Sequence, residues 1–143
     1  MSATQFSQSD YLTILTHAPA DPVKLLADEL IPALGEIAVL VNRTGLVMLP
    51  YTDTAQGTIF HLGEVLVSEA HVRIGGEVEG YALCMGRDLE QSLAIALLDA
   101  AITAGIKTDR IMAFVAEQAQ LQTEADRELL QKVESTRVEM ETF

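Results

Sequence analysis

The sequence contains a single cysteine, Cys84, which lies within an apolar stretch. One thiol cannot form a disulfide within its own chain, so a disulfide-stabilised secreted scaffold is excluded and a reducing compartment is expected. We expect Cys84 to serve as a small core residue. No run of about 18 apolar residues is present, which argues against a membrane-spanning helix. The first ten residues, MSATQFSQSD, lack the basic and then apolar pattern of a secretion signal. The expected location is the cytoplasm.

Basic residues are also scarce. Nine Lys and Arg stand against 21 Asp and Glu, which gives a net charge of −12. Such a charge repels phosphate backbones and anionic lipids, so neither nucleic acid nor a membrane is expected as a partner. A length of 143 residues with 49% hydrophobic content predicts one globular domain spanning residues 1–143. We expect its polar residues 1–8 to be disordered.

Patterns that carry chemistry are missing as well. The three histidines, His17, His61 and His71, stand alone without the close spacing of a metal site. No glycine-rich loop is followed by a lysine and a helix, as a phosphate-binding loop would be, and no nucleophile elbow is present. Nothing in the sequence brings the carboxylates of Glu64 and Asp99 together. We therefore expect no catalytic residue, no metal site and no cofactor bound by this chain alone.

The most informative stretch of the sequence runs from Gly80 to Ala101. Small or apolar residues at 78, 80, 82 and 84 alternate with the larger Glu79, Tyr81, Leu83 and Met85, a period of two that predicts a strand. A helix that is apolar on most sides follows over 89–104. Asp88 takes the place of the helix N-cap, with Gln91 three residues later. Arg87 lies beside the free amides of this corner and is our candidate contact for an anion or for an acidic residue of this chain or a partner.

The remaining patterns predict an α+β fold with a four-stranded, mainly antiparallel sheet and helices packed on it before and after. Helices are expected over 10–17 and 21–35. Strands are expected over 36–41 and 46–51, joined by a hairpin turn at 42–45, and then in a long stretch ending at Ile74. A three-residue loop, 75–77, would place Arg73 opposite Glu79 and His71 opposite Tyr81 on the last strand.

The helix over 89–104 carries a second apolar strip, formed by Ile95, Leu98 and Ile102. One sheet covers only one helix face, so this strip must be covered by the C-terminal helices or by another protein. It is a candidate subunit interface. Two further helices are expected over 108–119 and 123–135, with a break near residues 121–123 because Thr123 begins a capping pattern.

The last eight residues, 136–143, return to a period of two. Val138 and Met140 alternate with charged residues, a pattern that forms one apolar edge in an extended chain. We expect an extended arm that adds as a strand to another subunit, with Val138 and Met140 at the interface. The alternative is that both side chains pack back onto this chain's own sheet.

Several segments resemble PhnG, a small subunit of the bacterial carbon–phosphorus lyase complex, and the resemblance runs from about residue 10 to the C-terminus. These segments are GLV at 45–47, FHLGEVLVSEAHVRI at 60–74, GYALCMGRD at 80–88, ALLDA at 96–100 and STRVEM at 135–140. Relatives often carry a basic or histidine-containing run after GRD, where this chain has Leu89-Glu90-Gln91-Ser92, and a basic residue in place of Glu69. The resemblance therefore assigns no phosphate contact here.

The resemblance implies a role in the first committed step of phosphonate use. In that step ATP and methylphosphonate form α-D-ribose 1-methylphosphonate 5-triphosphate, and adenine is released. A larger PhnI-like subunit is implied as the first partner and as the source of the chemistry, with ATP and a divalent metal as substrate of the whole complex. This chain would be an accessory, non-catalytic subunit of that transferase, inactive in isolation. The alternatives are a stand-alone small-molecule enzyme or binding protein and a self-assembling homodimer.

Overall fold

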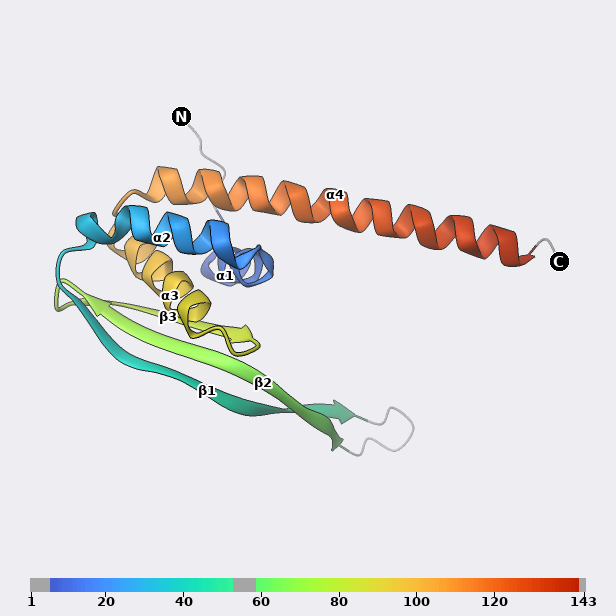
Figure 1. The fold of residues 1–143 in the computed structure, drawn as a ribbon, viewed down its shortest axis with the longest axis horizontal. Coiled ribbons are helices and arrows are strands. Elements are labelled where there is room, and N and C mark those ends of the chain that lie inside the picture. The colour runs from blue at the N-terminus through green and yellow to red at the C-terminus, as the bar shows by residue number, and fades with distance from the viewer. Residues whose placement is uncertain (1–5, 53–58, 142–143) are drawn as a thin grey trace.

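The computed structural model describes residues 6–52 and 59–141, with side chains placed for residues 6–48 and 63–136. Four helices and three strands make an α+β fold, as the sequence predicts at that level (Figure 1). In chain order they are α1 (Gln8–His17), α2 (Ala20–Leu34), β1 (Ile37–Thr52), β2 (Ile59–Ile74), β3 (Val78–Met85), α3 (Leu89–Ala104) and α4 (Thr108–Glu141).

The strands form one antiparallel sheet in the order β1-β2-β3, so β1 and β3 are its two edges. Helix α3 packs on β3 and β2, and α1, α2 and α4 pack in turn against α3. All four helices therefore lie on the same side of the sheet (Figure 1). The core fills the space between these layers and draws on every helix, from Leu15 and Leu30 to Ile95 and Val115.

The prediction of a four-stranded sheet is wrong. The residues expected to form two strands and a hairpin turn, 36–51, instead run through one strand, β1. Arg43 and Thr44, placed by the sequence in the turn, pair with Glu69 and Ser68 of β2. The reason is the length of β2: its sixteen residues offer a continuous backbone partner, which outweighs the local turn preference of 42–45.

The pairing of β2 with β3 is as predicted. The connection at 75–77 contains two glycines in the left-handed region, Gly75 at φ 59° and Gly76 at φ 75°, where other residues are strained. It sets Arg73 opposite Glu79 and His71 opposite Tyr81. Each of these cross-strand pairs therefore lies where the three-residue loop predicts.

Strand β3 and helix α3 approach each other very closely at Gly80. A Cβ atom built on Gly80 would lie 2.1 Å from the carbonyl oxygen of Ala96 and 2.8 Å from the Cβ of Ala100. Glycine opposite two alanines therefore lets the helix backbone rest directly on the strand. This close contact fixes the position of α3 over β3.

The N-terminal helices begin slightly earlier than predicted. The Ser7 side chain caps α1 by accepting a hydrogen bond from the Asp10 N–H, so residues 6–8 are ordered and the predicted disorder does not extend to them. Residues 1–5 lie outside the described part of the chain. Helix α2 starts at Ala20 and ends at Leu34, and the following Gly35, with a φ of 73°, stops the helix.

Helix α4 corrects two further predictions. It runs without interruption from Thr108 to Glu141, so the expected break near 121–123 is absent. Thr123 donates its hydroxyl to the Ala119 carbonyl one turn back, and this bond lets threonine sit inside the helix instead of starting one. The tail predicted to be extended over 136–143 is helical up to Glu141. The side chains of Val138 and Met140 lie outside the described residues.

Two segments project beyond the layered body. Gln122 of α4 still bonds the Ile14 carbonyl of α1 at 3.0 Å, but every described side chain of α4 beyond it, 123–136, is exposed. The second projection is the end of the β1–β2 pair, which continues past β3 because β3 pairs only with residues 67–74 of β2. Figure 1 shows both projections extending to the same side of the body.

Candidate functional site

The corner between β3 and α3 is closed by an ion pair. Asp88 caps α3 by accepting a hydrogen bond from the Gln91 N–H at 3.0 Å, and Lys24 of α2 reaches its carboxylate at 2.8 Å. The hydrogen bond from Lys24 holds the pKa of Asp88 below its usual range, and the same bond raises the pKa of Lys24. Asp88 thus takes the predicted capping role, and its charge occupies the helix end that could otherwise attract an anion.

Arg87 stands next to this ion pair and is exposed. No carboxylate among the described residues lies within 4.0 Å of its guanidinium. The structure therefore brings Arg87 to the same corner as Asp88 without joining the two groups. Whether Arg87 contacts a ligand or an acidic residue of a partner stays a prediction.

The apolar strip on α3, predicted as a candidate subunit interface, is largely buried within this chain. Ile95 and Leu98 have no exposed surface, and Ile102 is half-buried. The cover comes from this chain, since α1, α2 and α4 all pack on α3. The sequence left open whether the C-terminal helices or another protein cover this strip, and the structure shows cover by helices of this chain. The N-terminal helices contribute to this cover as well as α4.

The same helix carries Asp99, a carboxylate for which the sequence indicated no partner. Asp99, 1% exposed, accepts hydrogen bonds from the Tyr11 hydroxyl, from Gln8 Nε2 at 3.2 and 3.4 Å, and from the Tyr81 backbone N–H at 3.0 Å. Burial, with this bond to Asp99, raises the pKa of Tyr11, so the hydroxyl keeps its proton and remains a donor. Asp99 therefore joins α1, α3 and β3 in one network with its acceptors used, which is a structural role.

The bond from Tyr81 to Asp99 also protects the β3 edge of the sheet. The Tyr81 N–H points away from β2, toward the side on which a further strand could pair, and Asp99 occupies it. Helix α1 packs beside the same strand, where Leu12, Thr13 and Thr16 lie around one hollow with Tyr81 and Leu83. An edge covered in this way has little room for a strand from another protein.

At the opposite edge, no further strand of the described part of the chain pairs with β1. In an antiparallel ladder, backbone groups of successive residues point alternately to the two sides. The Gly86 N–H bonds the Leu66 carbonyl, so even-numbered residues of β2 face β3 and odd-numbered residues face β1. The odd-numbered residues of β2 pair with residues 41, 43, 45 and 47 of β1, whose backbone groups therefore face β2. The N–H and C=O groups of residues 42, 44, 46 and 48 consequently point outward, away from the sheet. No hydrogen bond found within the described part of the chain reaches these N–H groups.

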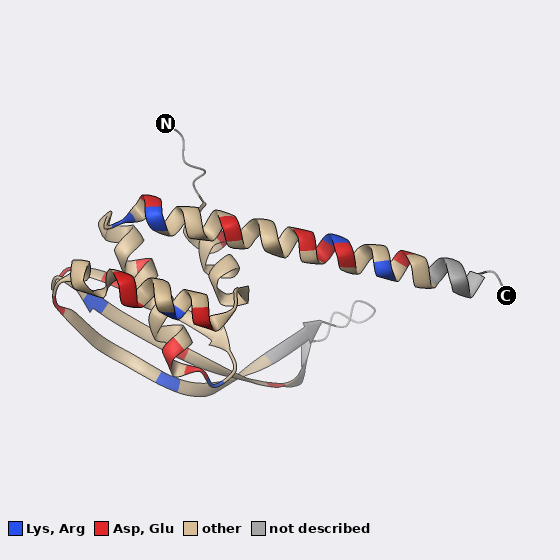
Figure 2. Ribbon diagram, turned by 45° about the horizontal axis from the view of Figure 1, so that its top comes forward, with Lys and Arg blue, Asp and Glu red and all other residues tan. Residues whose placement is uncertain are grey.

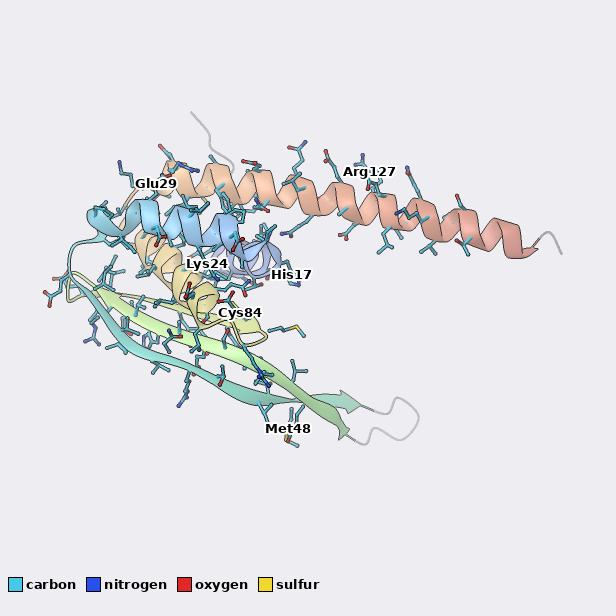
Figure 3. The ribbon with its side chains drawn as sticks, in the orientation of Figure 1. His17, Lys24, Glu29, Met48, Cys84 and Arg127 are labelled. Carbon is cyan, nitrogen blue, oxygen red and sulfur yellow. The ribbon has the colours of Figure 1, made fainter. Side chains whose placement is uncertain are left out.

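The side chains along this open edge are apolar. Leu46 is 62% exposed, Val47 40% and Met48 51%, although they alternate between the two faces of the strand. Arg43 is the one charged residue of β1. Figure 2 shows the contrast with α4, where acidic residues are frequent, and Figure 3 marks Met48 on the projecting strands. Large aliphatic groups exposed on both faces are typical of surfaces that contact other proteins.

The face of the sheet opposite the helices carries charged side chains that pair with one another. Glu69 accepts from Tyr81 and from Arg43 Nε, the latter at 2.9 Å. The hydrogen bond from Tyr81 and then the one from Arg43 hold the pKa of Glu69 below its usual range, while Glu69 raises the pKa of Tyr81 to about 12.

A second group on the same face joins Glu79 to Arg73 at 2.9 Å and to His71 at 2.6 Å. The bond from Arg73 contributes most to a lowered pKa of Glu79, and the bond from His71 comes next. These groups satisfy each other, and none is arranged as a nucleophile with its base. They stabilise the pairing of the strands.

The remaining features to consider are the cysteine thiol, possible metal ligands and possible membrane-spanning helices. Burial raises the pKa of the Cys84 thiol to about 11, so it is a neutral core side chain, as predicted. Within residues 6–52 and 59–141, no group of three or more His, Cys, Asp or Glu side chains could hold a metal ion. No helix in that part of the chain is long and apolar enough to cross a membrane.

The comparisons with known proteins give one result. A family model described as "Phosphonate metabolism protein PhnG" matches residues 7–143, nearly the whole chain. A search of curated proteins finds no match.

Proposed function

Because the chain belongs to the PhnG family of phosphonate metabolism proteins, we propose that it is an accessory, non-catalytic subunit of the phosphonate-activating complex of carbon–phosphorus lyase. The complex would form α-D-ribose 1-methylphosphonate 5-triphosphate from ATP and methylphosphonate, with release of adenine. ATP, with a divalent metal, is the substrate of the complex, and this chain alone holds no cofactor. The proposed location is the cytoplasm.

One observation carries the proposal: three carboxylates of the core and the sheet are bonded within the chain, whereas large aliphatic groups on two projections are exposed. Asp99, Glu69 and Glu79 have their bonding partners within the chain. A two-stranded ribbon and an unsupported helix are each of marginal stability in water. The ribbon and the outer half of α4 therefore favour an assembly role over a catalytic one.

The outer half of α4 offers one contact surface for the first expected partner, a PhnI-like subunit. Leu121, Leu129 and Val133 are 51%, 60% and 53% exposed and recur at multiples of four residues along the helix. Leu129 and Val133 continue the side of α4 that buries Ile111 and Val115 against the body, because 18 residues, or five turns of about 3.6 residues, separate Leu129 from Ile111 and Val133 from Val115. A partner placed beside the body would extend the existing packing along this strip.

The reaction provides the first test. The chain, purified free of other subunits, is expected to release no adenine from ATP and methylphosphonate when the products are separated by chromatography. Co-expression with the PhnI-like subunit and the other companions is expected to restore release. Turnover by the isolated chain, or full turnover by companions that lack it, would overturn the proposal.

A pair of variants tests the assembly role. Leu129→Ser with Val133→Ser removes two exposed aliphatic groups of the strip, and Gln120→Ser with Gln131→Ser makes a matched change on the opposite side of the helix. We expect both proteins to keep their melting temperatures, and only the first to bind the companions more weakly in gel filtration. A homodimer in isolation that the first pair disrupts would instead support self-assembly.

A further inference from the structure

The two edges of the sheet differ in whether their outward-pointing backbone groups are hydrogen-bonded, which decides whether another strand can pair there. On β3 the outward Tyr81 N–H is bonded by Asp99, and α1 packs alongside. On β1 the outward groups of residues 42, 44, 46 and 48 have no bond within the described part of the chain. An exposed edge of this length, with apolar side chains, is a template for further pairing, and proteins normally block it with lysines, prolines or covering elements. The middle of β1, 42–48, contains no lysine and no proline.

We propose that the open edge of β1, residues 42–48, binds an extended segment of a protein partner, which adds to the sheet as a fourth strand. Backbone hydrogen bonds from Thr44, Leu46 and their even-numbered neighbours would provide the affinity. We take this partner to be a companion subunit of the proposed complex, and for the identity of the partner this inference rests on the proposed function.

The side chains on β1 define what the added strand looks like. Leu46 and Met48 are exposed on one face and Val47 on the other, so the incoming strand has aliphatic neighbours on both of its faces. A strand in that position is expected to be a nearly continuous run of Val, Ile or Leu, as in strands buried on both sides. A strand with strict alternation of apolar and charged residues would leave one of these faces uncovered.

Charge decides between a companion and a second copy of this chain. The whole chain carries −12, so two copies repel each other at close range. An uncharged or basic segment meets no such repulsion, and β1 itself contributes only Arg43, which is already paired with Glu69. The favoured occupant is therefore an uncharged or basic strand of a different protein.

A substitution that removes one outward N–H tests this proposal. Proline lacks the N–H group and is tolerated on edge strands where that group faces outward. Thr44→Pro removes an outward donor of β1 without removing an aliphatic side chain. Leu83→Pro is the matched control, because the Leu83 N–H, two residues after that of Tyr81, points outward from the other edge.

Both variants would be co-expressed with the companion subunits of the proposed complex, and affinity would be measured by surface plasmon resonance. We expect Thr44→Pro to weaken binding at least about tenfold, and Leu83→Pro to bind like the wild type. Equal binding by Thr44→Pro and wild type would overturn the edge proposal while leaving the proposed function intact. Wild-type protein that binds no companion would overturn the proposed function and this partner with it. A wild-type dimer that Thr44→Pro dissociates would assign the edge to a second copy.

Discussion

Strand β3 lies under α1, touches the α3 backbone at Gly80 and has its Tyr81 N–H bonded to a buried carboxylate, whereas β1 at the other edge has exposed aliphatic groups on both faces. Both strands are edges of the same small sheet, so their difference cannot come from the sheet itself. It comes from where the chain places its helices and the buried carboxylate of Asp99. Protection of β3 and not of β1 among the described residues is the basis for the proposal that β1 pairs with a further strand.

The largest effect is expected from removing the carboxylate that protects β3. Asp99→Ala leaves the Tyr11 hydroxyl, the Gln8 amide and the Tyr81 N–H without their acceptor in a buried site. Its cost to the free energy of unfolding should be about 3 to 4 kcal/mol, measured by urea denaturation. Asp99→Asn keeps one acceptor oxygen and should cost clearly less. If Asp99→Ala were as stable as the wild type, the network would not hold the β3 edge.

A pair of glycine substitutions compares the two edge strands directly. Gly80→Ala places a methyl group 2.1 Å from the Ala96 carbonyl oxygen and should cost about 2 to 3 kcal/mol, because strand and helix must move apart. Gly45→Ala on β1 meets no atom within 4 Å and should leave the melting temperature nearly unchanged. Similar losses in both variants would mean that β1 is packed as tightly as β3.

The sequence predicted the elements whose signals are local. The Asp88 cap, the turn at Gly75-Gly76 and the strand that follows it depend on a few adjacent residues, and all are found where expected. The hairpin at 42–45 was also a local signal, but the long partner strand β2 overrode it. The period of two over 137–141 covers too few residues to exclude a helix, which continues there from α4.

The candidate site depended on contacts that no local pattern contains. Asp99 meets Tyr11 and Gln8, which lie 88 and 91 residues away in the sequence, so its network could not be derived from spacing. The available signal was an aspartate among the otherwise apolar residues 93–102 of α3. The open edge was hidden for a related reason, since dividing β1 into two strands concealed that its middle is paired on one side only.

The smallest effect concerns the face of the sheet opposite the helices, where a network crosses all three strands. Tyr81→Phe removes the hydrogen bond that contributes most to lowering the pKa of Glu69, so that pKa should rise toward its ordinary value. A lowered carboxyl pKa contributes stability above the unfolded-state value that is lost as the pH falls through the folded-state value. The acid unfolding of the variant should therefore begin at slightly higher pH.

Glu69 can be followed by NMR titration in both proteins, with Glu79 as the internal control because it does not contact Tyr81. An unchanged Glu69 titration in Tyr81→Phe would show that the hydrogen bond from Tyr81 does not set the pKa of this carboxylate, and that this bond does not join β3 to β2 on this face.

Amide hydrogen exchange at single-residue resolution tests the difference between the two edges most directly. In the isolated chain, the Tyr81 N–H should exchange slowly because Asp99 binds it, and the Thr44 and Leu46 N–H groups should exchange almost as fast as in an unfolded peptide. In the complex with companion subunits, Thr44 and Leu46 should become protected while Leu83 stays unchanged. Slow exchange at Thr44 and Leu46 in the isolated chain, or fast exchange at both in the complex, would contradict the account.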